Sequence, residues 1–338
     1  PEANSRDLQV VAVVNGTVAG LISYGDLEVA IRSVKEKGAN VSVVLHQMLG
    51  HVPERISELV TATKRSACWV WLHDYFSICP GFNLLRNGIS YCGAPPAKSQ
   101  SCTICRYGTE RLSHQIRIKT LFERIQPKVL SPSEATADIW RRRSGLSFEK
   151  IDIHPHVNLG WTDRETVLPL VSSSPVKVGF LGVPASHKGW DVFSELFLKH
   201  GRNGRFEFIY LGSYEVSEAM ERKSVSVTVD APNGMLDAVQ DTQLDLVLHM
   251  APWPETFAFT AFEALAGGAA ILTNPSSGNV ADLVEKTGRG LIFDNDSALR
   301  DAFDGDTLIK LARKMRENRA RQTPNFTLSQ MAVPEIIG

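Results

Sequence analysis

One stretch near the C-terminal end constrains the fold more than any other, because it places an apolar helix between two apolar strands. Leu244–Met250 predicts a buried strand, and two prolines stiffen the turn that follows it. The next residues form a helix that is apolar nearly all round, two glycines interrupt it, and Ala270–Thr273 predicts a second strand. Such a unit packs into a parallel sheet that helices cover. The chain is therefore expected to be an α/β protein.

Two carboxylates punctuate this stretch. Glu255 lies in the turn and Glu263 lies inside the helix. A carboxylate on an otherwise apolar helix is unusual, because burying an unpaired charge is costly. One interpretation is that backbone donors satisfy Glu263. The other is that Glu263 points at a polar ligand, since ligands of open α/β sheets bind at the carboxyl ends of the strands, where this turn lies.

These glutamates and their neighbours resemble a known signature. Seven residues separate Glu255 from Glu263, Phe257 and Phe259 lie between them, and the sequence Glu-Ala-Leu-Ala-Gly-Gly begins at the second glutamate. The pattern resembles the E-x7-E signature of retaining GT-B glycosyltransferases of the family-4 type. The resemblance implies that Glu255 lies near the donor sugar. It also implies that Glu263 holds the ribose of the nucleotide.

The start of the helix is expected to face the diphosphate of the donor. A helix N-terminus presents unpaired N–H groups and a partial positive charge, which favours phosphate. By the same resemblance, the chain around the phosphates consists of Thr256, Phe257, Ala258 and Phe259. The sequence departs from the family at Ala258, where Gly is usual, and at Ala270, where Pro is usual.

A second loop, Gly182–Gly189, lies between a predicted strand and a predicted helix. A cation at Lys188 can meet a phosphate together with the helix amides. The family has an Arg soon after the first Gly of this loop and a Lys before the second. Here Gly182 and Lys188 are present, Val183 holds the Arg position, and His187 is a candidate substitute. The alternative is a solvent-exposed Lys in a capping loop.

Strands and helices alternate through both halves of the chain, which predicts two doubly wound, Rossmann-like domains facing each other across a cleft, as in the GT-B fold. The expected domains are residues 1–165 on the acceptor side, with a Cys-rich insertion at about 79–108, and residues 175–325 on the nucleotide-sugar side. Residues 160–175 read as a linker, and 326–338 as a tail that returns to the first domain. The expected strands are Leu8–Val14, Val41–Gln47, Ala67–Asp74, Lys128–Ser131, Ile151–Ile153, Val176–Leu181, Phe206–Leu211, Val225–Val229, Leu244–Met250, Ala270–Thr273 and Gly290–Phe293.

His73 and Asp74 end the third predicted strand, at the edge of the sheet where ligands bind. Histidine suits proton transfer near neutral pH. In similar enzymes a His or Asp at this strand end lies beside the donor sugar and the acceptor hydroxyl. One of the two is expected to act with Glu255 at the catalytic centre, and the sequence does not choose between them. The alternative is that both side chains bond to backbone groups at the strand end.

Four cysteines are spaced as Cys79-x12-Cys92-x9-Cys102-x2-Cys105. A C-x2-C pair supplies half of a tetrahedral zinc site, and two further thiolates complete it. A long irregular segment also needs some internal constraint. We therefore expect a structural zinc ion here. An iron–sulfur cluster needs the same ligands, and the alternatives are free thiols or a redox pair.

Composition excludes some classes of function. The chain has 36 basic and 37 acidic residues and a formal net charge of -1. Nucleic-acid binding would require a broader basic surface than Arg141–Arg143 offers. No apolar run has the length of a membrane span, and no signal peptide is visible. The odd cysteine count indicates a reducing compartment. The expected location is the cytoplasm, which allows peripheral association with the inner face of the membrane.

The expected activity is transfer of a sugar, with retention, from a nucleotide-diphosphate sugar to a hydroxyl of a glycan or lipid-linked glycan. No catalytic metal is expected, because there is no D-x-D motif and because Lys188 and the helix start replace the cation. One alternative is a non-catalytic GT-B-like module of a larger polysaccharide-assembly protein. Another is a sugar-nucleotide epimerase on the same fold.

Overall fold

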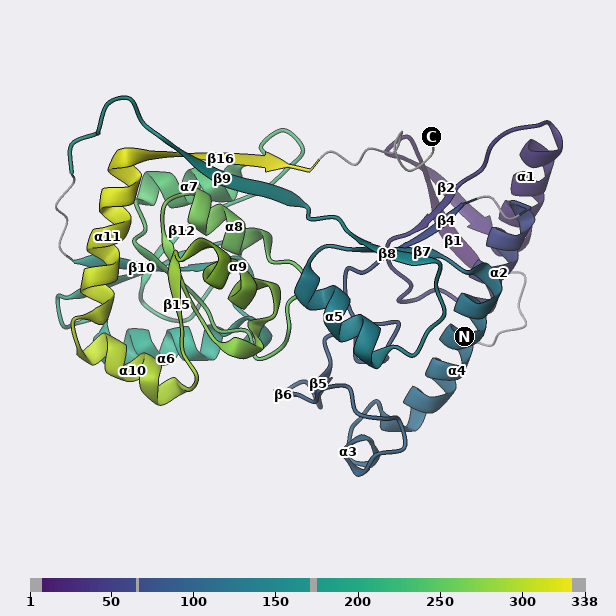
Figure 1. Ribbon diagram of the computed structural model, residues 1–338, viewed down its shortest axis with the longest axis horizontal. Helices are drawn as coiled ribbons and strands as arrows, with labels where there is room; N and C mark the ends of the chain where they lie inside the picture. Colours follow the sequence, from purple (N-terminus) through teal and green to yellow (C-terminus); the bar gives the residue numbers. More distant parts are fainter. Residues whose placement is uncertain (1–7, 65–66, 171–174, 330–338) are drawn as a thin grey trace. The chain divides into compact units, whose positions relative to one another are not determined.

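The computed structural model describes residues 8–64, 67–170 and 175–329. The chain divides into two compact units, with the boundary between His154 and Pro155 (Figure 1). The short segment Gly88–Tyr91 is grouped with the second unit. Each unit contains a parallel sheet, so the expected α/β class with two Rossmann-like domains is confirmed. The cleft between the domains stays a prediction.

The second unit is built on a sheet whose described strands number six, all parallel, in the order β12-β11-β10-β13-β14-β15. In sequence order this is 3-2-1-4-5-6, the order of the dinucleotide-binding fold. The strands are β10 (Val176–Leu181), β11 (Phe206–Leu211), β12 (Glu221–Lys223), β13 (Leu246–His249), β14 (Ala270–Thr273) and β15 (Gly290–Ile292). The chain order reverses between β10 and β13, and that point is where ligands of such sheets bind.

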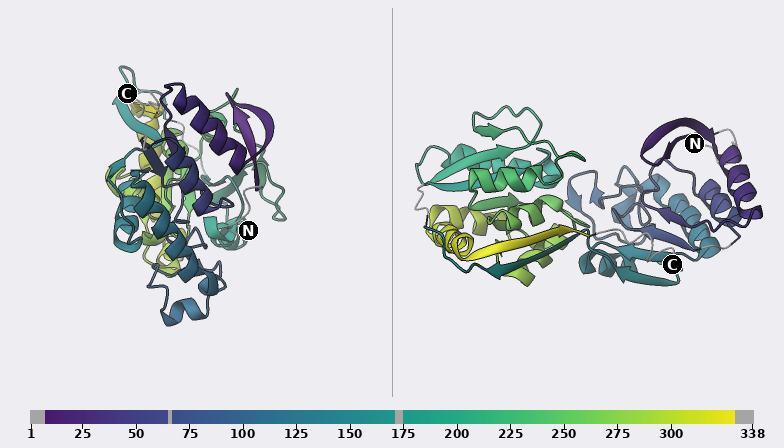
Figure 2. Two further views of the ribbon diagram at one scale, coloured as in Figure 1. Left: turned by 90° about the vertical axis from the view of Figure 1, so that its right-hand side faces the viewer. Right: turned by 90° about the horizontal axis from the view of Figure 1, so that it is seen from above.

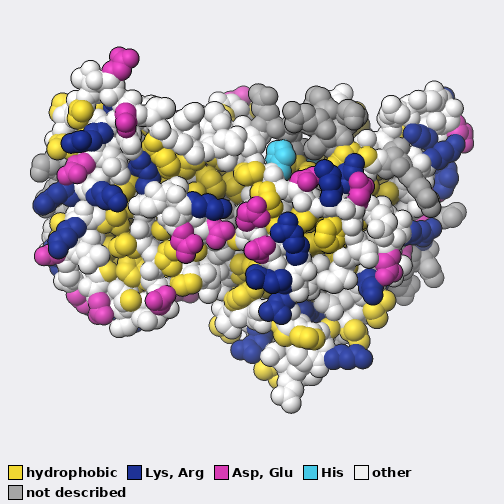
Figure 3. All heavy atoms as spheres, viewed as in Figure 1, with side chains coloured by type: hydrophobic (Ala, Val, Ile, Leu, Met, Phe, Trp, Pro, Cys, Tyr) yellow, Lys and Arg dark blue, Asp and Glu magenta, His cyan; other side chains and the backbone are white. Residues whose placement is uncertain are grey.

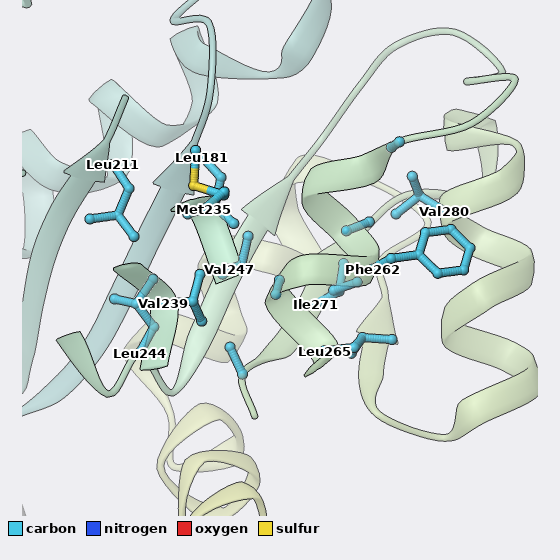
Figure 4. Close-up of a cluster of buried hydrophobic side chains, with 14 of the residues drawn as sticks. Leu181, Leu211, Met235, Val239, Leu244, Val247, Phe262, Leu265, Ile271 and Val280 are labelled. Atoms are coloured by element: carbon cyan, nitrogen blue, oxygen red, sulfur yellow. The ribbon is translucent and has the colours of Figure 1, made fainter. Parts of the chain in front are cut away.

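Helices cover both faces of this sheet. They are α6 (Trp190–His200), α7 (Gly234–Thr242), α8 (Phe259–Ala266), α9 (Asn279–Thr287), α10 (Asp296–Asp304) and α11 (Thr307–Arg321), with 3-10 turns η1 (Ser186–Lys188) and η2 (Pro275–Ser277). Successive strand residues point to opposite faces. Ile209 and Leu211 of β11 therefore pack with α7, α8 and α9, whereas Phe208 and Tyr210 pack with α6, α10 and α11. Figure 4 shows the hydrophobic core on the face that α7, α8 and α9 cover.

A buried ion cluster fixes the start of β13. Asp245 is fully buried, and its carboxylate accepts hydrogen bonds from Arg316 Nε at 2.9 Å and Arg319 Nη2 at 2.8 Å. It also accepts one from the backbone amide of Lys177 at 3.1 Å. The cluster ties α11 to the beginnings of β10 and β13.

Replacing Asp245 by alanine should cost about 3–5 kcal/mol of unfolding free energy, because it leaves two guanidinium groups without their shared counter-charge. Urea unfolding at equilibrium measures this. Asp241→Ala is the matched control, since it removes an exposed partner of Lys223 and should cost about 1 kcal/mol or less. A loss at Asp245 no larger than that of the control would contradict the structural role of the cluster.

The first unit contains a parallel sheet of four described strands in the order β3-β4-β7-β8. Its strands are β3 (Val43–Leu45), β4 (Cys68–Trp71), β7 (Lys128–Ser131) and β8 (Lys150–Ile153). Its helices are α1 (Tyr24–Glu36), α2 (Pro53–Ala62), α3 (Gln100–Thr103), α4 (Gly108–Ile125) and α5 (Glu134–Arg143). Two short strands, β5 (Leu85–Arg86) and β6 (Ser90–Tyr91), lie in the Cys-rich segment.

Two predicted strands differ in detail from the structure. The strand at the N-terminal end exists, but β1 (Gln9–Val14) pairs with β2 (Thr17–Ser23) in an antiparallel hairpin and not with the parallel sheet. Asn15 and Gly16 close this hairpin, both with positive φ, which is the Asn-Gly turn that favours hairpins. The strand expected at Val225–Val229 is instead β12, a few residues earlier.

The ends of the second unit also differ from expectation. Residues 160–163, predicted as linker, belong to β9 (Val157–Asp163). This strand pairs antiparallel with β16 (Gln322–Leu328), and the two run side by side (Figures 1 and 2). The first residues of the expected tail therefore pair within the second unit. Residues 330–338 lie outside the described residues, so their return to the first domain stays a prediction.

The surface carries charges of both signs. On the face drawn in Figure 3, Lys and Arg side chains are interspersed with Asp and Glu, and this face has no broad basic surface of the kind that nucleic acids bind. None of the helices in the described residues combines the length and the apolar character that crossing a bilayer requires.

Candidate functional site

The loops that follow β10 and β13 meet at the reversal point of the second sheet. Gly182, directly after β10, has φ 88°, and its amide donates to Leu211 O at 2.9 Å. A Cβ on Gly182 would lie 3.6 Å from the Thr260 methyl, so this loop lies against the start of α8. A Cβ on Gly189 would lie 2.8 Å from the Met250 backbone. The two glycines thus let the loop that contains η1 approach the end of β13 and the start of α8.

This approach brings Lys188 to Glu255. Lys188 Nζ lies 2.6 Å from Glu255 Oε1, and the side chain of Glu255 is only 3% exposed while that of Lys188 is 31% exposed. His249, the last residue of β13, places Nε2 at 3.7 Å from the same oxygen. The Lys188 ammonium also lies 5.7 Å from the centroid of the Trp253 ring, whose Nε1–H donates to His187 O at 3.1 Å. The predicted sugar-side carboxylate and the predicted phosphate-side lysine are therefore in contact.

The electrostatics of this pair follow from its surroundings. Burial alone would raise the pKa of Glu255, but the neighbouring His249 and Lys188 hold it below its ordinary value. Glu255 is thus a buried carboxylate that stays ionised at neutral pH. The predicted substitute cation behaves differently, because burial and the charge of Lys188 lower the pKa of His187. A substitute role for His187 stays a prediction, and Val183, at the position of the family's Arg, is exposed.

Gly278 and Asn279 hold the backbone of Glu255. The amide of Asn279 donates to Glu255 O at 3.0 Å. Gly278 has φ 57°, and a Cβ there would lie 2.8 Å from the Pro254 backbone. Asn279 is buried, yet its Oδ1 has no hydrogen-bond partner among the described residues. An acceptor without a partner beside the candidate site is available to a ligand.

The start of α8 follows closely after Glu255, the partner of Lys188. Within the described residues no side chain caps the helix, and Ala258 occupies the N-cap position. The first amides of a helix have no intrahelical partner and attract anions. Phe257 and Phe259 flank Ala258 and both contact the ring of His156, at centroid distances of 4.9 and 5.5 Å. Ala258 itself is part of the hydrophobic core, which explains how a methyl group is accommodated where the family has Gly.

Glu263 lies on the second turn of α8. It is 7% exposed, and burial raises its pKa from 4.5 to about 7. This carboxyl therefore titrates near neutral pH. A group whose ionisation is this costly is a candidate for a polar ligand that stabilises its charged form.

Two residues of the site were missed in the sequence. His249 and Trp253 flank Glu255 and Lys188, but a histidine at the end of a strand and a tryptophan between two prolines carry no distinct motif. The position of His249 gives one general signal. It is the last residue of a buried strand, at the edge where sites form.

His73 and Asp74 lie in the first unit, just after β4. His73 Nε2 lies 2.9 Å from His46 Nδ1, and the two rings stack with Trp71. Burial and the charge of His46 lower the pKa of His73, whereas Asp74 raises it. Asp74 accepts from the amide of Phe76 at 2.8 Å and from the Gln47 side chain. Asp74 thus bonds to the backbone, as in the structural alternative, and the catalytic role of either residue stays a prediction.

The expected zinc or iron–sulfur site is not supported. Cys79, Cys92, Cys102 and Cys105 line one small cavity and are not joined in disulfides. No three His, Cys, Asp or Glu side chains of the described residues are arranged to hold a metal ion. Arg111 instead donates from Nη1 to Cys102 Sγ at 2.8 Å. A guanidinium at a thiol occupies space that a fourfold thiolate site would need. The four cysteines thus lie around one cavity, as the spacing suggested, but the described side chains are not arranged as metal ligands.

Comparison with known proteins adds to this geometry. No protein-family model matches the sequence, and no curated protein matches it. Solved structures do match. The glycosyltransferase from Rickettsia africae ESF-5 has 15% identity and a TM-score of 0.53, over 87% of this chain and 74% of that chain. HepE of Anabaena in complex with UDP and glucose has 13% identity and a TM-score of 0.52, over 88% of this chain and 79% of that chain.

A third similar structure is the pneumococcal O-GlcNAc transferase GtfA in complex with UDP and GlcNAc, with 12% identity and a TM-score of 0.52. The match covers 92% of this chain and 58% of that one, so this chain spans little more than half the length of GtfA. These likenesses show that the chain has the fold of GT-B glycosyltransferases. The family-4 type and the E-x7-E signature stay predictions.

Proposed function

We propose that this protein is a retaining glycosyltransferase that uses a UDP-sugar. The observation that carries the proposal is the contact between Lys188 and the buried Glu255 at the reversal point of the sheet, beside the start of α8. A cation, a helix start and a carboxylate are there within one small region. UDP is proposed because similar structures, HepE and GtfA, were solved with UDP bound.

In the proposed reaction the bond between the sugar and the diphosphate breaks, and negative charge develops on the leaving UDP. Lys188 and the first amides of α8 stabilise that charge. Glu255 lies on the sugar side, where its ionised carboxylate accepts hydrogen bonds from sugar hydroxyls. Glu263 accepts hydrogen bonds from the ribose. No catalytic metal is required in this scheme, because the cation and the helix start supply the positive charge.

The proposed acceptor is a hydroxyl of a glycan or of a lipid-linked glycan, and the new bond keeps the anomeric configuration of the donor. Both features rest on the resemblance of Glu255 and Glu263 to the retaining signature. Ala258 and Val183 depart from that signature and favour the competing candidate, a non-catalytic module on the same fold. Nucleotide binding distinguishes the two.

The test is a thermal-shift titration with UDP, GDP, ADP and TDP at matched ionic strength. UDP at about 100 times its Kd should add roughly 2.7 kcal/mol of stability, and the other three should add clearly less. A selective response to UDP supports the transferase. Flat curves for all four nucleotides would overturn the proposal in favour of the non-catalytic module.

A further inference from the structure

A pocket lies at the edge of the same sheet opposite the candidate donor site. It has a volume of about 360 Å³ and is lined by residues of β9, α7, α8, α11 and β16. Asp245 marks this edge at the beginning of β13, whereas His249 ends that strand at the donor site. Helix α8 likewise begins at the donor site and ends here at Gly267. Eight residues of helix span roughly 12 Å, so the two sites are separate.

The lining of this pocket is strongly basic. It includes Arg164, Arg289, Arg316 and Arg319, and none of the described residues that line it is an Asp or Glu. The charges of Arg316 and Arg319 are partly neutralised, since both form ion pairs with the buried carboxylate of Asp245. Arg319 Nη1 also donates to Gly268 O at 3.2 Å, at the end of α8. One carboxylate is thus the shared counter-charge of two of the four guanidinium groups.

Arg289 has no such counter-charge. Its side chain is nearly buried, with 9% of the residue exposed, and its guanidinium lies 3.9 Å from the centroid of the Trp161 ring. Its hydrogen-bond partner is the neutral amide of Gln322. Among the residues that the structure describes, no Asp or Glu lies within ion-pair distance of it. Burial lowers the pKa of Arg289, although the group stays charged. A cation–π contact offsets only part of the cost of burying a charge.

Arg164 extends the same basic surface. Its Nε donates to Gln322 O at 3.2 Å, and it too has no acidic partner within ion-pair distance in the described part of the chain. Gln322 therefore holds both arginines, one through its side chain and one through its backbone. Both arginines line the pocket, and no described residue that lines it is an Asp or Glu.

We propose that this arginine pocket binds a small phosphate monoester. An arginine guanidinium binds two phosphate oxygens at once. A tetrahedral dianion would therefore supply the negative counter-charge that Arg164 and Arg289 lack. The volume lies in the range of about 300–1,000 Å³ that is typical of small-molecule sites, so it accommodates a phosphate with an organic group attached. The ligand is distinct from the sugar nucleotide, because the donor site lies at the opposite edge of the sheet.

The experiment measures binding of inorganic phosphate and of ribose 5-phosphate by calorimetry and thermal shift, with sodium chloride at equal ionic strength as the reference. The proteins are the wild type, Arg289→Gln and Arg164→Gln. Arg313→Gln is the matched control, because Arg313 is an exposed arginine of α11 that does not line the pocket. Arg164 is only half-buried, so its variant tests the site even if Arg289→Gln does not fold.

We expect saturable binding that weakens at least tenfold in each pocket variant and is unchanged in Arg313→Gln. Saturating UDP should not displace the phosphate compound. Tighter binding of ribose 5-phosphate than of inorganic phosphate supports the monoester, and equal binding would overturn it in favour of the free anion. The proposal is overturned if phosphate raises Tm equally in all four proteins, which is the general stabilising effect of this salt, or if UDP displaces it.

Discussion

Replacing Lys188 by methionine is expected to lower the rate of sugar transfer by about 10²–10³-fold, the loss typical of removing one group that stabilises developing negative charge. Methionine keeps most of the side-chain volume and removes the ammonium. The loss should appear mainly in kcat, since the charge on the leaving diphosphate is largest in the transition state. The measurement is UDP release from UDP-glucose and from UDP-GlcNAc with a glycan acceptor present, after the release without acceptor is subtracted.

The matched control is Lys199→Met, which removes an exposed lysine from α6, the helix that follows the loop of Lys188. That variant should keep the wild-type rate. Turnover by Lys188→Met within twofold of the wild type would remove this lysine from the mechanism.

A complementary variant, Glu255→Gln, separates binding from turnover. Lys188 is engaged by Glu255 in this structure, 2.6 Å away, and the carboxamide releases it to meet phosphate. UDP binding should therefore be retained or become tighter while transfer is lost. Weaker UDP binding in Glu255→Gln than in the wild type would contradict the competition for Lys188 that the geometry implies.

The parts of this fold that were predictable from the sequence are those that local physics determines. The apolar runs of β10, β11, β13 and β14 have no other stable place than a sheet buried on both faces. The strand–turn–helix step around Glu255 and Glu263 lies within one continuous stretch, so its position at the edge of the sheet follows from chain order. The loop containing Lys188 follows for the same reason.

The rest depends on contacts between residues far apart in the chain. β9 and β16 pair across more than 150 residues, and neither strand has the apolar run that would predict a strand from the sequence. The contact of His249 with Glu255 is local in the chain, but it depends on the conformation of the turn between them, which no motif specifies. Four cysteines with suitable spacing predicted a metal site, but the position of Arg111 is not encoded in that spacing. Arg164, Arg289 and Arg316 likewise come from separate elements, and nothing local relates them.

Replacing Glu263 by glutamine should make the free protein more stable at pH 8 and make its binding of UDP weaker. The pKa of Glu263 is raised from 4.5 to about 7, so the folded state holds this proton more tightly than the unfolded state. The group therefore lowers stability as pH rises from about 4.5 to 7. At about 1.4 kcal/mol per pKa unit, its ionised form costs on the order of 3 kcal/mol at pH 8. Glutamine does not ionise and avoids this cost.

The same group should control donor affinity. Ribose hydroxyls stabilise the charged carboxylate, so UDP should bind more tightly as pH rises from 6 to 8, and this dependence should disappear in Glu263→Gln. Loss of a hydrogen bond to a charged group costs about 1.5–3 kcal/mol, which corresponds to roughly 10–150-fold in Kd at pH 8.

Thermal unfolding at pH 5 and pH 8, together with UDP calorimetry at both pH values, measures the two effects of Glu263→Gln. Glu285→Gln, an exposed carboxylate on α9, is the control and should change neither. If Glu263→Gln is stabilised at pH 8 and yet binds UDP as well as the wild type, the carboxylate is a buried structural group and the ribose lies elsewhere. If both effects appear, burial of Glu263 lowers the stability of the free protein in return for tighter nucleotide binding.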